Sequence, residues 1–280
     1  ADILPDGTLR MGSVGGVDPR ILPAATVTVH ATGEGQSRAL TGVVGALPPH
    51  LMSAQDRERN YTREELFVDL CMAPEKVKKL VRIGDLITLQ GPAVRLLNHR
   101  AASKTMDDRS CVGCLLLAAE RLQKMQHMCD LYFVCSSQEE VGGRGAAVAA
   151  YTVDPDLAVV LDVTFAPTPQ CPPDTTCPLD TPAVTYGPYV QHRLLERLKQ
   201  TAKENGMKLS GEHAERWTGT DADDVQIARA GIPCVLISLP VKYMHTTVEL
   251  LDMDTLSECG RLLALFLAGI DEKWEDGLWN

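Results

Sequence analysis

The sequence is poor in aromatic residues, which make up 5% of its 280 residues. Its core must therefore be built mainly from Leu, Val, Ala and Ile. It also lacks any apolar run of ~18 residues, which excludes a membrane-spanning helix and a membrane as partner. The first residues, Ala1–Gly7, contain neither a basic stretch nor an apolar one, so we do not interpret them as a signal peptide.

Positive charge is scarce as well. The chain has 27 Lys and Arg against 37 Asp and Glu, a formal net charge of −10. Proteins that bind nucleic acid need a basic face to displace counterions, so nucleic acid is excluded as a partner. The remaining composition, 45% hydrophobic and 23% charged, is that of an ordinary globular protein.

The nine cysteines are odd in number and scattered, and several lie in apolar runs, as Cys135 does. We interpret them as buried thiols of a protein in the reducing cytoplasm. Cys111 and Cys114 form a CxxC pair, but no second Cys or His pair follows at zinc-ribbon spacing. This pattern favours two cysteines that pack a helix.

Residues 1–98 differ in pattern from the rest of the chain. β-type stretches such as Thr26–His30 and Asp85–Leu89 are separated there by Gly, Pro and Asp turns. Helical periodicity is nearly absent, apart from a short candidate at Ala73–Leu80. The pattern predicts a small β-rich domain.

Residues 99–280 alternate apolar runs with helical periodicity. Runs at Leu131–Ser136, Leu157–Val163 and Ile232–Ser238 predict buried strands. Helices are expected at Cys111–Met125, Gly145–Tyr151, Tyr189–Asn205, Asp221–Ala230 and Asp252–Ala268. This alternation predicts an α/β domain with a mixed, mostly parallel sheet flanked by helices. The Pro- and Thr-rich segment Ala166–Thr185 is expected to be a loop.

Acidic residues lie at the ends of these predicted strands, where ligands bind in such sheets. The candidates, with one histidine, are Asp107, Asp108, Glu139, Glu140, Asp162 and His245. Carboxylates and imidazole together are ligands that zinc-like cations prefer. A site with two metals bridged by one carboxylate would use most of them, and a further carboxylate would serve as base.

Taken singly, most of these residues have a structural explanation. A pair such as Glu139–Glu140 is usually a solvated loop or the start of a helix. Asp107 can cap the next helix, and a lone His245 is more often a core or surface histidine than a ligand. Asp162 is harder to explain, because an Asp that closes a buried apolar run needs a partner.

The combination of motifs resembles the glutamyl/leucyl aminopeptidase family of two-metal peptidases, the tetrahedral aminopeptidase type. Gln138–Ala146 is similar to the family's EEVGxRGA signature, and Lys104–Arg109 is similar to its KaxDDR pattern. Further similar segments are Gly45–Leu51, Leu161–Thr164, Gly219–Ala222, Ala230–Pro233 and Pro240–Thr246. The resemblance covers essentially the whole chain in order. Some members carry a cellulase label, but these residues do not suggest glycoside chemistry.

The resemblance implies a role for each candidate. Asp107 would bridge two divalent metal ions, zinc or cobalt, with manganese as a further candidate. Asp162 would bind the first metal, and Glu140 and His245 would bind the second. Glu139 would be the general base and acid.

The resemblance also implies an architecture. Residues 99–280 would form the α/β catalytic domain of zinc-peptidase type, and residues 1–98 a small inserted β-barrel domain used for dimerisation. Homodimers would assemble into a homododecamer. Asp107 and Asp108 would be joined by a strained, cis peptide bond.

One element of the family pattern does not occur, a His-x-Asp pair whose His binds the first metal. It would stand a few residues before Ala1, and none of the seven histidines replaces it. We therefore expect an incomplete first site in this chain, while the second keeps Asp107, Glu140 and His245. Other departures flank the ligands, so substrate preference is not transferred; these are Cys111, Thr218, Lys242 and Thr246.

The expected function is that of a metal-dependent aminopeptidase. A metal-bridged hydroxide would attack the first peptide carbonyl of a peptide substrate, with Glu139 transferring the proton. The alternatives are a one-metal or non-catalytic assembly member of the family and a related metal-dependent deacylase or carboxypeptidase. Metal content and turnover of aminoacyl p-nitroanilides would separate them.

Overall fold

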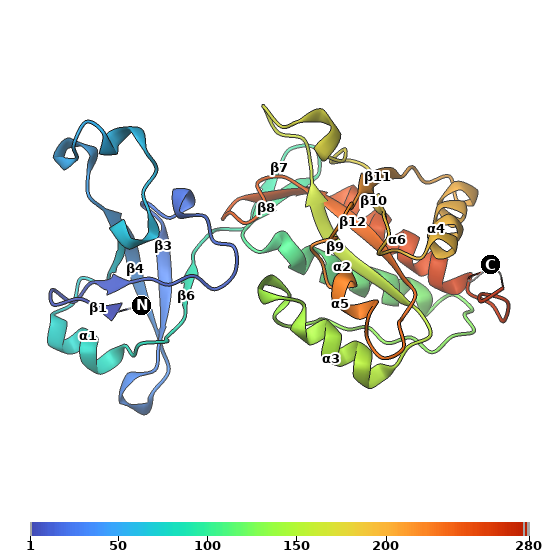
Figure 1. The fold of residues 1–280 in the computed structure, drawn as a ribbon, viewed down its shortest axis with the longest axis horizontal. Coiled ribbons are helices and arrows are strands. Elements are labelled where there is room, and N and C mark those ends of the chain that lie inside the picture. The colour runs from blue at the N-terminus through green and yellow to red at the C-terminus, as the bar shows by residue number, and fades with distance from the viewer. Residues whose placement is uncertain (1, 277, 279–280) are drawn as a thin grey trace. The chain divides into compact units, whose positions relative to one another are not determined.

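The structure is a computed structural model that describes residues 2–276 and 278. The chain divides into two compact units, which Figure 1 shows in colour order along the chain. The first unit extends to Pro92, and the segment 245–247 is counted with it; the second holds residues 93–244 and those from 248 onward. Among the described residues, none of the helices combines the length and the apolar character needed to span a bilayer.

The first unit is an antiparallel sheet with the strand order β1-β2-β5-β4-β3-β6. Its elements are β1 (Asp2–Ile3), β2 (Leu9–Arg10), β3 (Thr26–Ala31), β4 (Arg38–Ala46), β5 (Leu66–Asp69), α1 (Pro74–Leu80) and β6 (Ile87–Leu89). Buried and accessible residues alternate along β3, where Val27 and Val29 point into the core. Val77 of α1 joins the same core.

The expected β-barrel is not seen. The end strands β1 and β6 do not pair with each other within the described part of the chain. They are two and three residues long, so they offer few groups for the hydrogen bonds that would close a barrel. The unit is an open antiparallel sheet.

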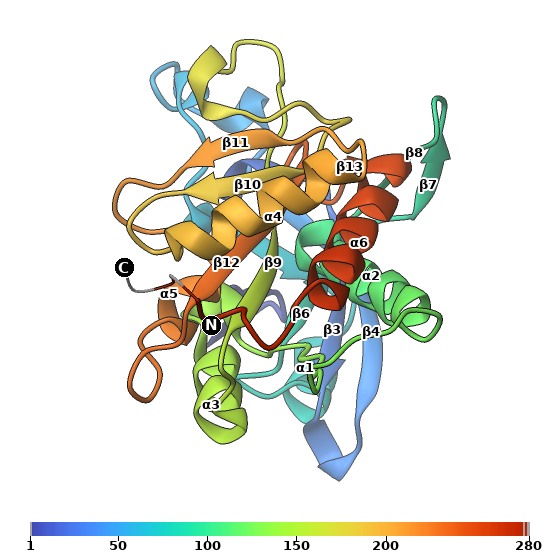
Figure 2. The same ribbon diagram turned by 90° about the vertical axis from the view of Figure 1, so that its right-hand side faces the viewer.

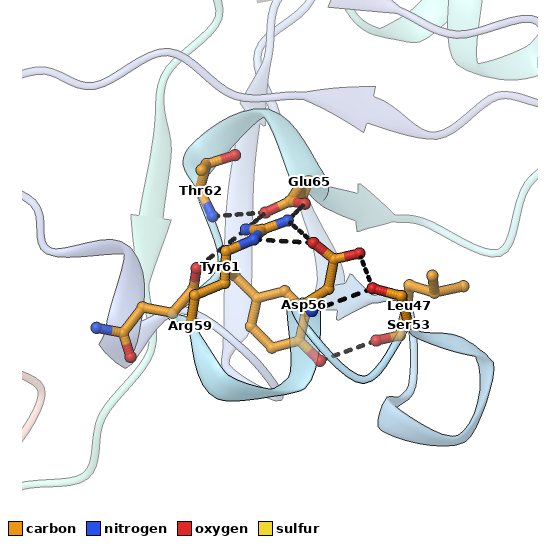
Figure 3. Close-up of polar contacts among 8 residues, drawn as sticks. Leu47, Ser53, Asp56, Arg59, Tyr61, Thr62 and Glu65 are labelled. Carbon is orange, nitrogen blue, oxygen red and sulfur yellow. Dashed lines mark hydrogen bonds and ion pairs between the residues drawn. The ribbon is translucent and has the colours of Figure 1, made fainter.

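The loop between β4 and β5 is held by a polar network. Figure 3 shows the Arg59 guanidinium between Asp56 and Glu65, with 2.6 Å between its Nη2 and Glu65 Oε1. The Tyr61 hydroxyl donates to the Leu47 carbonyl at 2.8 Å. The Arg59 side chain lowers the pKa of Glu65 to about 2, with further help from the Thr62 N–H.

The second unit is a mixed α/β structure. Its elements are β7 (Val94–Leu96), β8 (Arg100–Ser103), α2 (Met106–Leu122), α3 (Arg144–Val153), β9 (Ala158–Phe165), β10 (Ala183–Tyr186), α4 (His192–Glu204), β11 (Ser210–His213), α5 (Ala222–Val225), β12 (Cys234–Val241), β13 (Glu249–Asp252) and α6 (Met253–Ala268). The main sheet has the order β11-β10-β12-β9, in which β11 is parallel to β10, β12 is parallel to β9, and β10 is antiparallel to β12. A smaller antiparallel sheet joins β13, β8 and β7.

Helices cover both faces of the main sheet. Val235, Ile237 and Leu239 belong to one core together with buried residues of α2, α4 and α6. Figure 2 looks onto the face that α4 covers. Cys234 belongs to a second core with residues of α3 and α5. Because side chains alternate along a strand, Ser238 points to the same side as Cys234.

Several local predictions were wrong. Leu131–Ser136 forms no strand, and Tyr132 is 70% exposed, because no described strand pairs with this segment. The expected loop Ala166–Thr185 ends in β10, and the helix expected at Asp221–Ala230 is shortened to the four residues of α5.

The cysteines are free thiols, but they are not all buried as expected. Cys71 and Cys135 are exposed, and Cys129 and Cys171 are partly exposed. Cys135 was expected inside a buried strand, so its exposure follows from the absence of that strand. The CxxC pair is buried in α2, where the Cys114 thiol donates to the Leu256 carbonyl of α6 at 3.4 Å.

Candidate metal centre

Asp107 lies where β8 leads into α2. Its backbone and that of Asp108 are non-helical, and the peptide bond between the two residues is cis, as the resemblance predicts. The Asp107 N–H donates to Glu249 Oε2 at 3.1 Å. Glu249 is 3% exposed and stands on β13, which pairs with β8, so the small sheet helps to orient Asp107.

Asp162 lies on β9 opposite Ser238 of β12. It is 7% exposed, and its Oδ1 accepts the Val163 N–H at 2.8 Å. Burial raises the pKa of Asp162 to about 9, and the negative charges of Asp108, Asp107 and Glu139 add to this effect. A carboxylate here requires either a proton or a cation.

Asp108 is partly buried beside Asp107. Burial raises its pKa to about 8, and the charge of Asp107 acts in the same direction. A hydrogen bond from the Cys111 thiol opposes the shift. Asp108 Oδ1 is buried and has no hydrogen-bond partner among the residues that the structure describes.

Glu139 and Glu140 begin a single turn of 3₁₀ helix, Glu139–Val141, just before α3. Gln138 precedes them with φ 64°, and the Gly142 N–H closes the turn on the Glu139 carbonyl at 2.8 Å. The Glu139 side chain is half-buried, whereas that of Glu140 is exposed. The two adjacent carboxylates therefore have different surroundings.

Asp107, Glu140 and His245 form a potential metal site. Each offers one ligand atom, and these three atoms lie within 4.8 Å of one another. His245 stands in the connection from β12 to β13, and its flanking residues Met244 and Val248 belong to the second unit.

The residues present fit a divalent cation. Two carboxylates and one imidazole are a donor set that zinc-like ions prefer. Burial raises the pKa of the neighbouring Asp162 to about 9, and nearby negative charges add to the shift. A cation at this position would remove that electrostatic cost.

Two contacts of the candidate site escaped the sequence reasoning. Glu249 accepts the Asp107 N–H, and Asp221 accepts the Ser136 hydroxyl at 2.5 Å. A signal for Glu249 existed, because it stands alone among Val248, Leu250 and Leu251, and an isolated acid in a buried apolar run needs a partner. No comparable signal marked Asp221 as a partner of Ser136.

Comparison with known proteins assigns the chain to a family. The family model described as M42 glutamyl aminopeptidase matches residues 1–262. The chain belongs to this family. As a member of the M42 family, it is a metal-dependent aminopeptidase and hence a hydrolase.

Individual relatives agree with this assignment. The chain is 36% identical over 251 residues to the lysyl aminopeptidase of Pyrococcus furiosus, covering 88% of this chain and 71% of that protein. The crystal structure of a TET aminopeptidase from Thaumarchaeota archaeon SCGC AB-539-E09 matches with a TM-score of 0.91 and 27% identity, covering 99% of this chain and 79% of the other. The TET1 peptidase of Pyrococcus horikoshii matches with a TM-score of 0.81 and 26% identity, covering 96% and 79%. That peptidase can assemble into a tetrahedron or a large octahedral shell.

Proposed function

We propose that this M42 protein removes the N-terminal residue from peptides, with Glu139 as general base and acid. The observation that carries the proposal is the convergence of ligand atoms from Asp107, Glu140 and His245 within 4.8 Å, with Glu139 next to Glu140 on the same helical turn. Asp162, whose pKa responds to the charges of Asp107 and Glu139, would complete the ligand set.

These residues would hold one or two divalent cations, with zinc or cobalt as first candidates and manganese as a further one. Asp107 would be shared between the two positions, Asp162 would serve the first, and Glu140 and His245 the second. When bound, such cations lower the pKa of water and polarise a carbonyl group. Glu249 would keep the Asp107 carboxylate in place through its bond to the Asp107 N–H.

The proton transfers would belong to Glu139. A half-buried carboxylate beside the proposed ligands is placed to accept a proton and to pass it on. Glu139 would take a proton from the attacking water and pass it to the departing amino group. The Gly142 and Gly143 N–H groups donate to the Glu139 carbonyl, and these bonds hold the backbone from which the Glu139 side chain extends.

We further propose a cytoplasmic homo-oligomer in which residues 1–98 contribute the dimer contact. The TET1 relative from Pyrococcus horikoshii assembles into closed shells, and a homododecamer built from homodimers is the corresponding expectation. Light scattering at micromolar concentration tests it. A strictly monomeric mass would contradict this part alone.

The matched variants Glu139→Gln and Glu140→Gln test the division of roles. Glu139→Gln should abolish turnover of aminoacyl p-nitroanilides and keep its metal content, because its carboxylate is not a ligand. Glu140→Gln should lose metal as well as activity. Metal content is measured by elemental analysis after dialysis.

Three results would contradict the proposal. Equal metal loss in both variants would overturn the separate roles of the two glutamates. Binding of metal by the unaltered protein without turnover of any aminoacyl substrate would favour a non-catalytic assembly protein. Preference for N-acyl substrates would favour a deacylase.

A further inference from the structure

Glu139 and Glu140 stand on the segment 136–145, a loop that runs into the first residues of α3 and that no strand of the described structure anchors. Their precision must come from contacts of this loop, called here the glutamate loop. We propose that Asp221 is a positioning residue that fixes the glutamate loop through Ser136, with Asp224 bracing its other end. The catalytic part of this inference rests on the proposed function of Glu139.

The contact between Ser136 and Asp221 is short and partly buried. The Ser136 hydroxyl donates to Asp221 Oδ2 at 2.5 Å, across 85 positions of the sequence. A hydrogen bond to a carboxylate is stronger than one between neutral groups. Asp221 Oδ1 is buried and has no hydrogen-bond partner in the described part of the chain. A buried oxygen without a partner lowers the stability of the fold, so the presence of Asp221 here calls for an explanation other than stability.

The other end of the glutamate loop lies against α5. A Cβ atom on Gly143 would lie 1.9 Å from Asp224 Oδ2, so the loop backbone and this carboxylate are already in close contact. Asp221 and Asp224 therefore approach the glutamate loop at two places, one before Glu139 and one after Glu140. Residues between two fixed points have little freedom to shift.

The segment that carries these aspartates is itself well held. Asp223 accepts the N–H groups of Thr218 and Gly219 at 3.0 Å each. It also accepts the Thr218 hydroxyl at 2.8 Å. These bonds close the turn before α5, so Asp221 and Asp224 start from a fixed backbone. Asp223 thus stabilises its own turn, whereas Asp221 and Asp224 contact the glutamate loop.

The glutamate loop is also closed internally, so it moves as one piece. The Gly142 and Gly143 N–H groups both donate to the Glu139 carbonyl, and the Gly145 N–H donates to the Ser137 carbonyl at 2.9 Å. Loss of the Ser136 tether would therefore displace both glutamates together. Misplacement of a catalytic group by ~1 Å can lower the rate ~100-fold.

The test compares Ser136→Ala and Asp221→Ala with Ser136→Thr, which keeps the hydroxyl, and with Asp156→Asn, an exposed acid of the same unit. Each variant is assayed for kcat and KM at saturating manganese, for thermal unfolding, and for hydrogen exchange of the segment 136–145. Exchange is measured on metal-free protein, so it does not depend on activity.

We expect Ser136→Ala and Asp221→Ala each to lower kcat ~10–100-fold with little change in KM, and to speed exchange in the glutamate loop alone. The double variant should be no worse than either single one, because both remove the same contact. Ser136→Thr should restore kcat, and Asp156→Asn should match the unaltered protein.

Two outcomes would overturn the inference. One is unchanged kcat and unchanged loop exchange in both variants. The other is faster exchange throughout the unit with a parallel fall in Tm, which would mean a purely structural role. If the unaltered protein turns over no aminoacyl substrate, the proposed function fails, and the loop exchange alone then decides whether Asp221 positions the loop.

Discussion

The two units of this protein each bring carboxylates together, and they treat the negative charge in opposite ways. In the first unit, Asp56 and Glu65 are accessible to solvent and share Arg59 as a partner, and the pKa values of both are lowered. In the second, Asp162 is buried and Asp108 is partly buried, both near further carboxylates, and the pKa values of both are raised.

We interpret the acids of the first unit as structural and those of the second as part of the proposed metal site. Solvent-accessible acids that share an Arg partner hold a loop together at little cost in free energy. A buried group without a counter-charge destabilises the fold, and it persists where a ligand supplies the missing charge. The raised pKa values of these acids point to the candidate metal centre more directly than the number of acids does.

The largest expected effect is that of metal on stability. Manganese suits this test, because it prefers oxygen ligands and binds less to the nine thiols of the unfolded chain. A hundredfold excess over Kd should add about 2.7 kcal/mol to the free energy of unfolding. The gain is measured by thermal unfolding against a chelator control. It should shrink in Asp107→Asn, and an equal gain in that variant would place the binding elsewhere.

A medium effect is expected from Asp162→Asn, and its sign depends on metal. Because the folded pKa of Asp162 is raised from 3.8 to about 9, its contribution is lost as pH rises through this range, and the metal-free protein becomes less stable. The neutral variant should therefore unfold at higher temperature at pH 8, by roughly 2–4 °C for each kcal/mol regained. With manganese the order should reverse. If Asp162→Asn is less stable than the unaltered protein in the absence of metal, the negative charge of Asp162 does not destabilise the fold.

The smallest effect is expected in the first unit, from Glu65→Gln. The pKa of Glu65 is lowered from 4.5 to about 2, so its contribution is present above pH 4.5 and lost as pH falls toward 2. Solvent screens the pair with Arg59, so the change in Tm at pH 7 should be smaller than that of Asp162→Asn. Arg59→Lys, which keeps the charge, is the matched control. If Glu65→Gln changed the metal affinity, the exposed acids of the first unit would not be separate in function from the acids of the candidate site.

The sequence predicts the elements that depend mainly on their own residues. The periodic run before Ala268 became α6, and the apolar run Ile232–Ser238 lies largely within β12. Leu131–Ser136 has an equally apolar pattern, yet a strand exists only when a partner supplies the ladder, and a local pattern cannot show that partner. The same limit hid β10 in a Pro- and Thr-rich stretch.

The candidate site shows a similar division. The positions of acids and one histidine near predicted strand ends pointed to the candidates, and the resemblance assigned their roles, which stay predictions. The candidates are Asp107, Asp108, Glu139, Glu140, Asp162 and His245. The supports behind them could not be foreseen. The bond from Asp107 to Glu249 joins residues 142 positions apart, and only the folded chain makes them neighbours.

The close packing of the glutamate loop has a consequence for its tolerance to change. Gly145 has an ordinary φ, but a Cβ there would lie 2.3 Å from the Ser137 carbonyl oxygen, so any side chain is excluded for lack of space. Gly142 is the opposite case, with φ +112° and open space around it. A D-alanine introduced by chemical ligation would suit its backbone, whereas L-alanine would be strained. In a saturation library both positions would read as invariant glycine, yet mirror-image substitution would distinguish a constraint of handedness from one of volume.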